Sequence, residues 1–213
     1  MNTWIRLGLA VCTAYLLGSL NPAIFLSRVF VGQDIRTMGS GNAGSTNMYR
    51  NLGPKYALLT LLGDFCKTLL AVAAGQLITG GMDLPLGEMG RFAAGIAAVV
   101  GHAFPLFHRF RGGKGVVTAA AMVLLFDWRI FLVVFGTFLL FSVATRYISL
   151  GSVTGAAALP LAMGLFHPSR PVLLGGSLFV ALLIIFLHRG NLRRLLAGKE
   201  SKFYFRPPED MKK

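Results

Sequence analysis

A run of small and polar residues between two apolar segments is the first place where this sequence could do chemistry. It comprises Gly39-Ser40-Gly41-Asn42-Ala43-Gly44-Ser45-Thr46-Asn47, and Arg50 follows it. Glycines permit positive φ and leave backbone N–H groups open, which is how an anion-binding nest is built. Hydroxyl and amide side chains add donors, and an arginine can hold a phosphate with two parallel hydrogen bonds. The run predicts phosphate binding, and a flexible inter-helical loop is the alternative.

Two nucleotide-binding patterns resemble this run and are rejected. The spacing Gly39-x-Gly41-x-x-Gly44 matches the dinucleotide fingerprint, but no strand–helix–strand unit surrounds it. The interval from Gly39 to Gly44 also has Walker spacing, yet Ser45 stands where the phosphate-binding lysine is required.

A second polar run begins at His102, contains Pro105 and ends with Gly112-Gly113-Lys114-Gly115. We expect Lys114 close to the N-terminus of the next helix, where an anion would meet both a cation and the helix dipole. A solvated basic loop is the alternative interpretation. Together with the first run, the pattern favours a site for phosphate groups.

Other polar residues lie within or beside apolar segments. Asp64 and Lys67 are three residues apart, on one helix face. We expect them to pair with each other, in a structural or a functional role, or to face a polar cavity, because isolated intramembrane charges are costly. His188 and Asn191 share that spacing after the last apolar segment, in a basic tail of the kind that anchors to anionic lipid. Ser149 and Ser152 are interpreted by default as helix caps.

The composition defines the class of protein that must position these residues. Of 213 residues, 54% are hydrophobic and 14% are charged, against about 25% charged in soluble domains. The formal net charge is +13, but so apolar a chain is neither a nucleic-acid binder nor disordered. Cys12 and Cys66 lie in apolar stretches, without disulfide or metal-binding spacing. The chain is therefore predicted to be an all-α integral membrane protein, since long apolar runs fill it.

Seven transmembrane helices in a single domain, 1–213, are expected. Their predicted ranges are 4–26, 56–79, 88–106, 114–128, 130–146, 151–166 and 171–188. Sixteen Lys and Arg fall in the loops and tail on one side, and four, Arg6, Arg91, Arg129 and Arg170, on the other. The positive-inside rule then places the N-terminus outside and the C-terminus in the cytoplasm.

The cytoplasmic motifs resemble those of the acyl-phosphate:glycerol-3-phosphate acyltransferases of bacterial membranes. Three blocks carry the resemblance: Gly39-Ser40-Gly41-Asn42-x-Gly44-x-Thr46-Asn47; Gly101-His102-x-Phe104-Pro105 through Gly112-Gly113-Lys114-Gly115-Val116; and His188-Arg189-x-Asn191 through Arg194-Leu195 to Gly198-x-Glu200. Asp64-Phe65-x-Lys67 is a fourth match, in which Thr68 departs from the family's usual glycine.

The resemblance implies acyl transfer from acyl phosphate to the 1-hydroxyl of glycerol 3-phosphate, giving lysophosphatidic acid and phosphate. It implies that Gly39, Gly41, Asn42, Gly44, Thr46 and Asn47 cradle the acyl-phosphate phosphoryl group. It also implies that Arg50, Lys114, Ser152, His188 and Asn191 hold glycerol 3-phosphate, with Ser40 near both substrates, and that Asp64, Lys67 and His102 support the site. Ser40, Lys114, His188 and Asn191 are the candidate catalytic residues. A monomer in the inner membrane, with a cytoplasmic site and without cofactor, metal or nucleic acid, is expected.

The mechanism expected from these residues uses no covalent enzyme intermediate, because acyl phosphate already carries a good leaving group. No histidine has an aspartate five positions on, which excludes the His-x4-Asp mechanism of other glycerol-3-phosphate acyltransferases. Since Glu200 is the only acidic residue of the three blocks, we hypothesise that a substrate phosphate takes the hydroxyl proton. The competing functions are a transporter for a phosphorylated metabolite and a non-catalytic lipid-binding scaffold.

Overall fold

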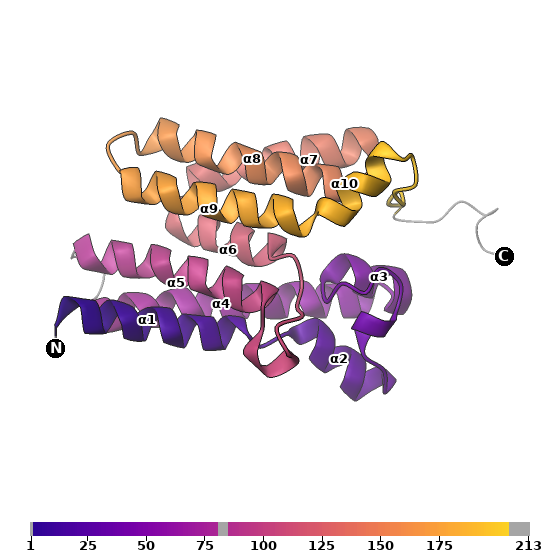
Figure 1. Cartoon of the computed structure of the whole chain (residues 1–213), viewed down its shortest axis with the longest axis horizontal. Coiled ribbons are helices and arrows are strands. Elements are labelled where there is room, and N and C mark those ends of the chain that lie inside the picture. Colours follow the sequence, from indigo (N-terminus) through magenta and orange to yellow (C-terminus); the bar gives the residue numbers. More distant parts are fainter. Residues whose placement is uncertain (1, 81–84, 205–213) are drawn as a thin grey trace. The chain divides into compact units, whose positions relative to one another are not determined.

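The computed structural model describes residues 2–80 and 85–204, and every regular element in those ranges is a helix (Figure 1). The chain divides into two compact units, Met1–Trp128 and Arg129–Lys213. The expected single domain stays a prediction.

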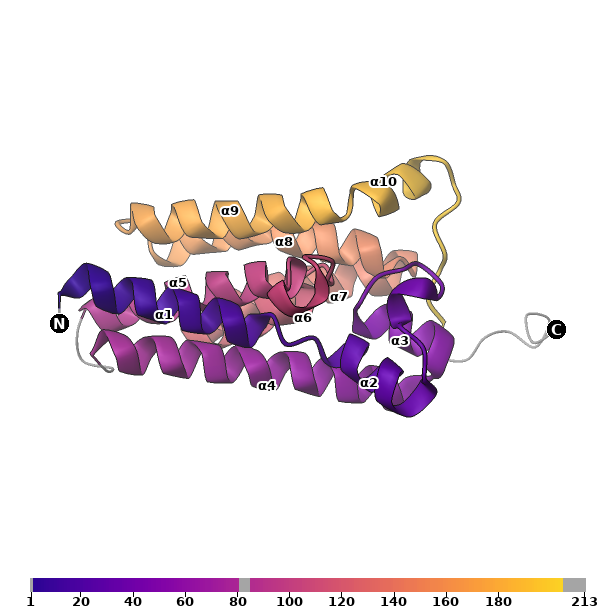
Figure 2. The ribbon, with the colours of Figure 1, turned by 60° about the horizontal axis from the view of Figure 1, so that its bottom comes forward.

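Three long helices form the body of the first unit: α1 (Thr3–Gly18), α4 (Pro54–Thr79) and α5 (Pro85–Ala103). They lie side by side (Figures 1 and 2). Small residues line their contacts, so that a Cβ added to Gly18 would overlap the backbone of Ala98, and one added to Gly75 would overlap Ala94. Such small residues allow membrane helices to approach closely, and here they bury alanines instead of large side chains.

The first predicted span, 4–26, is not one continuous helix, because the helix breaks after Gly18. A new helix, α2 (Pro22–Val31), begins with its N-cap at Asn21, whose side chain accepts a hydrogen bond from Ile24 N. Proline lacks the N–H that would continue the helical ladder, and its ring clashes with the carbonyl four residues earlier. The broken pair still counts as one candidate span, Thr3–Val31.

Short helices complete the first unit: η1 (Ile35–Thr37), α3 (Ser45–Leu52), η2 (Leu106–His108) and α6 (Val116–Phe126). The helix expected at 114–128 is shorter than predicted. Gly115, with φ of 74°, precedes it as the N-cap, and Asp127 is extended at its C-terminal end. Its 11 residues cover about 16 Å, roughly half of the ~30 Å hydrocarbon core.

The second unit contains α7 (Trp128–Thr145), α8 (Ile148–Phe166), α9 (Pro171–Leu187) and α10 (Arg189–Leu196). α8 packs against α9, and Gly151 of α8 fits so tightly against α7 that an added Cβ would overlap the Ser142 hydroxyl. The last two helices meet at His188 at an angle of 55°. His188 and Asn191 therefore lie at a bend, not on one straight helix.

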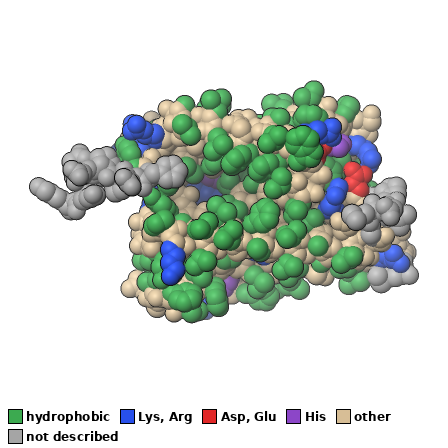
Figure 3. Space-filling view, turned by 180° about the vertical axis from the view of Figure 1, so that it is seen from behind, with side chains coloured by type: hydrophobic (Ala, Val, Ile, Leu, Met, Phe, Trp, Pro, Cys, Tyr) green, Lys and Arg blue, Asp and Glu red, His purple; other side chains and the backbone are tan. Residues whose placement is uncertain are grey.

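Five helical segments in the described ranges are long and apolar enough to cross a membrane. They are Thr3–Val31, Pro54–Thr79, Gly87–His108, Trp128–Thr145 and Ile148–Phe166. The bent pair α9–α10 makes six if it forms one span. Figure 3 shows one face of the molecule. Hydrophobic side chains are spread widely over this face, and the charged ones lie mainly toward its margins. Five or six candidate spans in an all-α fold are what an integral membrane protein requires, whereas seven spans stay a prediction.

Candidate active site

The first polar run forms a loop that is organised around the buried side chain of Asn47. The amide oxygen of Asn47 accepts hydrogen bonds from Ser40 N at 3.1 Å and from Asn51 Nδ2 at 2.9 Å. Its Nδ2 donates to the carbonyls of Ile35 and Met38. These four bonds use the whole hydrogen-bonding capacity of an amide side chain. Asn47 therefore shapes the loop from within, and Gly39 and Gly41 supply the positive φ that the loop needs.

The loop ends at the N-terminus of α3, where backbone donors are available. Gly44 is the N-cap and provides no side-chain hydrogen bond. The N–H groups of Ser45 and Thr46, the first two helical residues, donate to no acceptor within residues 2–80 and 85–204. Two backbone donors and the positive end of a helix dipole make this a place where a phosphoryl group can bind.

The second polar run folds back along the end of α5. Gly112 N donates to the carbonyl of Ala103 at 3.1 Å, and Gly113 N donates to that of His102 at 3.2 Å. A Cβ on Gly113 would overlap His102 Nε2 and would lie 2.6 Å from the carbonyl oxygen of Ala43. The two polar runs therefore meet where Gly113 lies against Ala43. Gly113 is the residue before Lys114, and Ala43 is the residue before Gly44, the N-cap of α3.

A buried charged cluster lies directly beneath this meeting point. Lys67 Nζ is 2.9 Å from Asp64 Oδ1 and donates to the carbonyl of Leu20 at 2.7 Å, at the break between α1 and α2. His102 Nδ1 is 2.8 Å from Lys67 Nζ and 3.1 Å from Asp64 Oδ1, so it accepts from the lysine or donates to the carboxylate. The predicted Asp64–Lys67 pair is confirmed, and its position connects α4, α5 and the helix break.

Arg36 provides a second connection between the two runs. Its Nη1 donates to the carbonyls of His108, at 2.9 Å, and Arg111, at 3.1 Å. Its other nitrogens bind Asp34, which also caps η1. Hydrogen bonds from the Arg36 side chain, helped by Arg28, hold the pKa of the Asp34 carboxyl well below its usual range. The same carboxylate raises the pKa of Arg36, so the link stays charged.

In the second unit, Glu200 holds the residues of the third block together. Its Oε1 accepts hydrogen bonds from Ser149 Oγ at 2.7 Å and Asn191 Nδ2 at 2.6 Å, and its Oε2 accepts from Arg194 Nε at 2.8 Å. Burial alone would raise the pKa of Glu200, but these hydrogen bonds, from Asn191 first, together lower it. The carboxylate is therefore charged and fixes the orientation of the Asn191 amide.

His188 and Ser152 are also fixed by backbone carbonyls. His188 is buried at the α9–α10 bend, and its Nδ1 donates to the carbonyl of Ile184 at 2.8 Å, which leaves the lone pair of a neutral ring on Nε2. Ser152 lies inside α8 and donates to the carbonyl of Ile148, the first residue of that helix. The default prediction that Ser152 is a helix cap is therefore wrong.

The structure thus brings together some predicted residues and adds others. In the first unit the two polar runs meet, and in the second unit His188 and Asn191 lie within one turn of each other. Arg36 and Glu200 are absent from the predicted site residues although they hold these parts in place. Glu200 had a detectable signal, since it is the only acidic residue between positions 188 and 208, whereas Arg36 had none because its partners are carbonyls 72 and 75 residues away.

Comparison with known proteins agrees with the geometry. Residues 8–198 match the family model described as glycerol-3-phosphate acyltransferase. The glycerol-3-phosphate acyltransferase of Pseudomonas fluorescens is 49% identical over 191 residues, covering 89% of this chain and 96% of that protein. The corresponding protein of Geotalea daltonii is 42% identical over 190 residues, with coverage of 89% and 94%.

The same similarity extends to solved structures. A crystal structure of PlsY (YgiH), an integral membrane glycerol 3-phosphate acyltransferase, in its glycerol 3-phosphate form, is 34% identical with a TM-score of 0.83. It covers 93% of this chain and 96% of its own. The form with lysophosphatidic acid gives a TM-score of 0.78 at the same identity, covering 93% of this chain and 95% of its own. These relatives favour an enzyme over the transporter and scaffold alternatives, and the chain belongs to the glycerol-3-phosphate acyltransferase family.

Proposed function

We propose that this enzyme transfers a fatty acyl group from acyl phosphate to the sn-1 hydroxyl of glycerol 3-phosphate. The products are lysophosphatidic acid and inorganic phosphate, and the reaction takes place in phospholipid biosynthesis at the cytoplasmic face of a bacterial inner membrane. The observation that carries this proposal is the contact of Gly113 with Ala43, because it joins two phosphate-binding motifs in one place. The solved relative described with glycerol 3-phosphate supports the identity of the acceptor.

The acyl-phosphate phosphoryl group is assigned to the loop of the first polar run. Gly39, Gly41, Asn42 and Gly44 supply the nest, and Thr46 adds a donor at the N-terminus of α3. Asn47 is assigned an indirect role, because its four hydrogen bonds are already made within the loop. This revises its sequence-based assignment as a phosphate ligand.

Glycerol 3-phosphate is assigned, in a monomeric enzyme, to the residues that the motif resemblance indicates. Arg50 and Lys114 supply the positive charge that offsets two approaching phosphates. Ser152, His188 and Asn191 complete the set, and Ser40 acts near both substrates. Asp64, Lys67 and His102 support the loops from below.

In the proposed reaction the sn-1 hydroxyl oxygen attacks the acyl carbonyl carbon and forms the ester bond. The bond from that carbon to the phosphate oxygen breaks, and phosphate leaves with the electron pair. The hydroxyl proton passes to a substrate phosphate oxygen, so the protein supplies positioning and charge stabilisation and no side-chain base. A replacement that abolished the chemical step while both substrates still bound normally would contradict this assignment of the proton.

The direct test is to supply the purified, folded protein in detergent with acyl phosphate and glycerol 3-phosphate, and to measure released phosphate and lysophosphatidic acid. Lys114→Ala should lower turnover at limiting glycerol 3-phosphate by about a hundredfold, since a charged hydrogen bond to phosphate contributes ~1.5–3 kcal/mol. Lys199→Ala removes an equal charge from the tail and should retain activity. No product from the wild type would refute the donor assignment, and near-normal turnover of Lys114→Ala would remove Lys114 from the site.

A further inference from the structure

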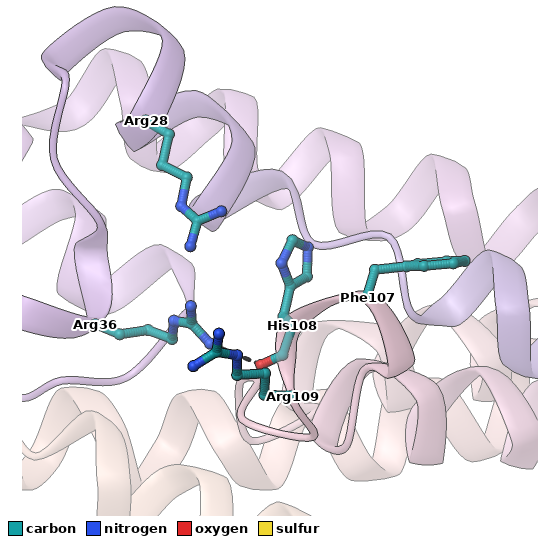
Figure 4. A pocket seen from close by; sticks show the side chains of 5 residues that line it. All are labelled: Arg28, Arg36, Phe107, His108 and Arg109. Atoms are coloured by element: carbon teal, nitrogen blue, oxygen red, sulfur yellow. Dashed lines mark hydrogen bonds between the residues drawn. The ribbon is translucent and has the colours of Figure 1, made fainter.

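The first unit has a pocket that none of the proposed substrate-binding residues lines. Its volume is about 390 Å³, at the small end of the range for ligand sites, roughly 300–1,000 Å³. The pocket is lined by Arg28, Arg36, Phe107, His108 and Arg109. Figure 4 shows the guanidinium groups of the three arginines directed toward one another, from α2, η1 and the turn after η2. The size suits a single head group and not an acyl chain.

The charges in this pocket are not balanced. Asp34 Oδ2 lies 2.8 Å from Arg28 Nη2 and 2.8 Å from Arg36 Nη2, so a single carboxylate serves two guanidinium groups. Arg109 donates no hydrogen bond and makes no ion pair with any other residue in the described ranges. Three arginines and one carboxylate leave two positive charges over, without counting His108. Like charges converging on one space repel each other, and a bound anion would remove that repulsion.

The turn that carries Arg109 has an unusual backbone. Arg109 and the next residue, Phe110, have φ of 57° and 56°, in the left-handed region that non-glycine residues rarely occupy. Arg36 donates to the carbonyls of His108 and Arg111, on either side of these two residues, and so secures the turn. The turn therefore holds an unpaired arginine at the pocket in spite of an unfavourable conformation.

The surroundings of the pocket indicate which anion fits. Two candidate spans end at it, one at Val31 and the other at His108. The helix and the turn that supply Arg28 and Arg109 also carry exposed apolar side chains: Phe25, Val29 and Phe30 on α2, and Phe107 and Phe110 on the turn. Arg28 and Arg109 thus lie close in the chain to the ends of two candidate spans, where we expect a membrane to change from hydrocarbon to head groups.

From this combination we infer that the pocket binds the phosphate head group of an anionic membrane lipid, at a site separate from the proposed catalytic residues. Arg28 and Arg109 would bind the phosphate, while Arg36 is committed mainly to Asp34 and the turn carbonyls. Free inorganic phosphate has the same head-group chemistry but lacks the acyl chains that the apolar border would contact. The experiment below distinguishes these two sources.

The test compares four proteins in nanodiscs of equimolar phosphatidylglycerol and phosphatidylcholine, and native mass spectrometry counts the lipids retained. The wild type should retain phosphatidylglycerol preferentially, and Arg28→Gln/Arg109→Gln should reduce that preference about tenfold, as expected when charged hydrogen bonds are lost. Lys55→Gln/Lys199→Gln removes two exposed charges elsewhere and should keep the preference. Arg109→Gln alone should lose part of the preference, and this variant breaks no side-chain hydrogen bond or ion pair within the described residues.

Three results would overturn the inference. The first is equal retention of phosphatidylglycerol by the wild type and both arginine variants. The second is displacement of the lipid by millimolar inorganic phosphate, which would make this a free-phosphate site. The third is an equal loss in the lysine control, which would reduce the effect to general surface charge. Acyltransferase turnover measured in the same samples should stay within about twofold of wild type in Arg109→Gln, as expected for a surface substitution that breaks no contact.

Discussion

At the scale of single residues, Gly113 is the position where a small change should have the largest effect. The ring of His102 and the carbonyl of Ala43 leave no space for a side chain there. Gly113→Ala should therefore push the two polar runs apart and lower turnover by more than about tenfold, because small misplacements of reacting groups are costly. The measurement is the rate of phosphate release at saturating and limiting glycerol 3-phosphate.

The matched control for this substitution is Gly136→Ala, since an added Cβ at Gly136 meets nothing within 4 Å. Alanine is favoured over glycine in a helix, so this variant should be active and at least as thermostable as the wild type. Full activity of Gly113→Ala would show that the contact between the runs does not matter to catalysis.

Glu200 is the second residue with a sharp expectation, because three donors converge on its buried carboxylate. Glu200→Ala leaves those donors without their acceptor and should cost roughly 1–3 kcal/mol of stability. Thermal unfolding in detergent measures this loss, and Lys199→Ala, an exposed neighbour in the same tail, serves as the control. An unchanged melting temperature would show that the network does not stabilise the second unit.

The lowered pKa of Glu200 also predicts a pH dependence. A carboxyl group whose folded pKa lies below its unfolded pKa stabilises the fold fully above the unfolded pKa, and this contribution is lost as the pH falls through the folded pKa. Stability should thus decline below the usual value of 4.5. Glu200→Gln should be less stable at pH 7, and the difference from wild type should shrink in acid. A constant difference down to pH 3 would contradict the expected shift.

At the scale of helices, the Asp64–Lys67–His102 cluster holds the break in the first span against α4 and α5. Removing one charge of a buried pair leaves the other uncompensated, at a cost of about 3–5 kcal/mol. Asp64→Asn and Lys67→Met should each destabilise the protein strongly. The double variant Asp64→Asn/Lys67→Met should lose less stability than the two single variants lose together. Thermal unfolding of the wild type and the three variants measures these losses. Strict additivity would mean that the pair has no coupling.

The limits of sequence-based prediction are also clearest at this scale. The apolar segments and the Asp64–Lys67 pair follow from hydropathy and i,i+3 spacing, both of which are local properties. The break at Asn21-Pro22 carries a cap and a proline that could have been recognised, but the surrounding apolar run obscures it. The His188 bend and the Arg36 bridge depend on tertiary partners, which no local pattern specifies.

At the scale of the whole molecule, the topology depends on the short helix α6. With sixteen basic residues on one predicted side and four on the other, the positive-inside rule predicts termini on opposite faces, and hence an odd number of crossings. The long spans with the bent α9–α10 pair give six. We expect the seventh crossing to be α6, whose 11 residues reach only about half of the ~30 Å hydrocarbon core. This prediction requires that the bilayer beside α6 is thinned or that α6 borders a water-filled region.

Cysteine labelling in spheroplasts tests this topology. In a background with Cys12→Ser and Cys66→Ser, single cysteines replace Asn2, Arg111, Trp128 or Lys199, and a membrane-impermeant thiol reagent is added before or after permeabilisation. Asn2→Cys and Trp128→Cys should react at once, whereas Arg111→Cys and Lys199→Cys should react only after permeabilisation. The pair Arg111 and Trp128 brackets α6, so their opposite behaviour would show that this helix crosses the membrane. If both positions reacted from the same side, α6 would be a re-entrant segment, and the charge distribution would require a different arrangement of the remaining spans.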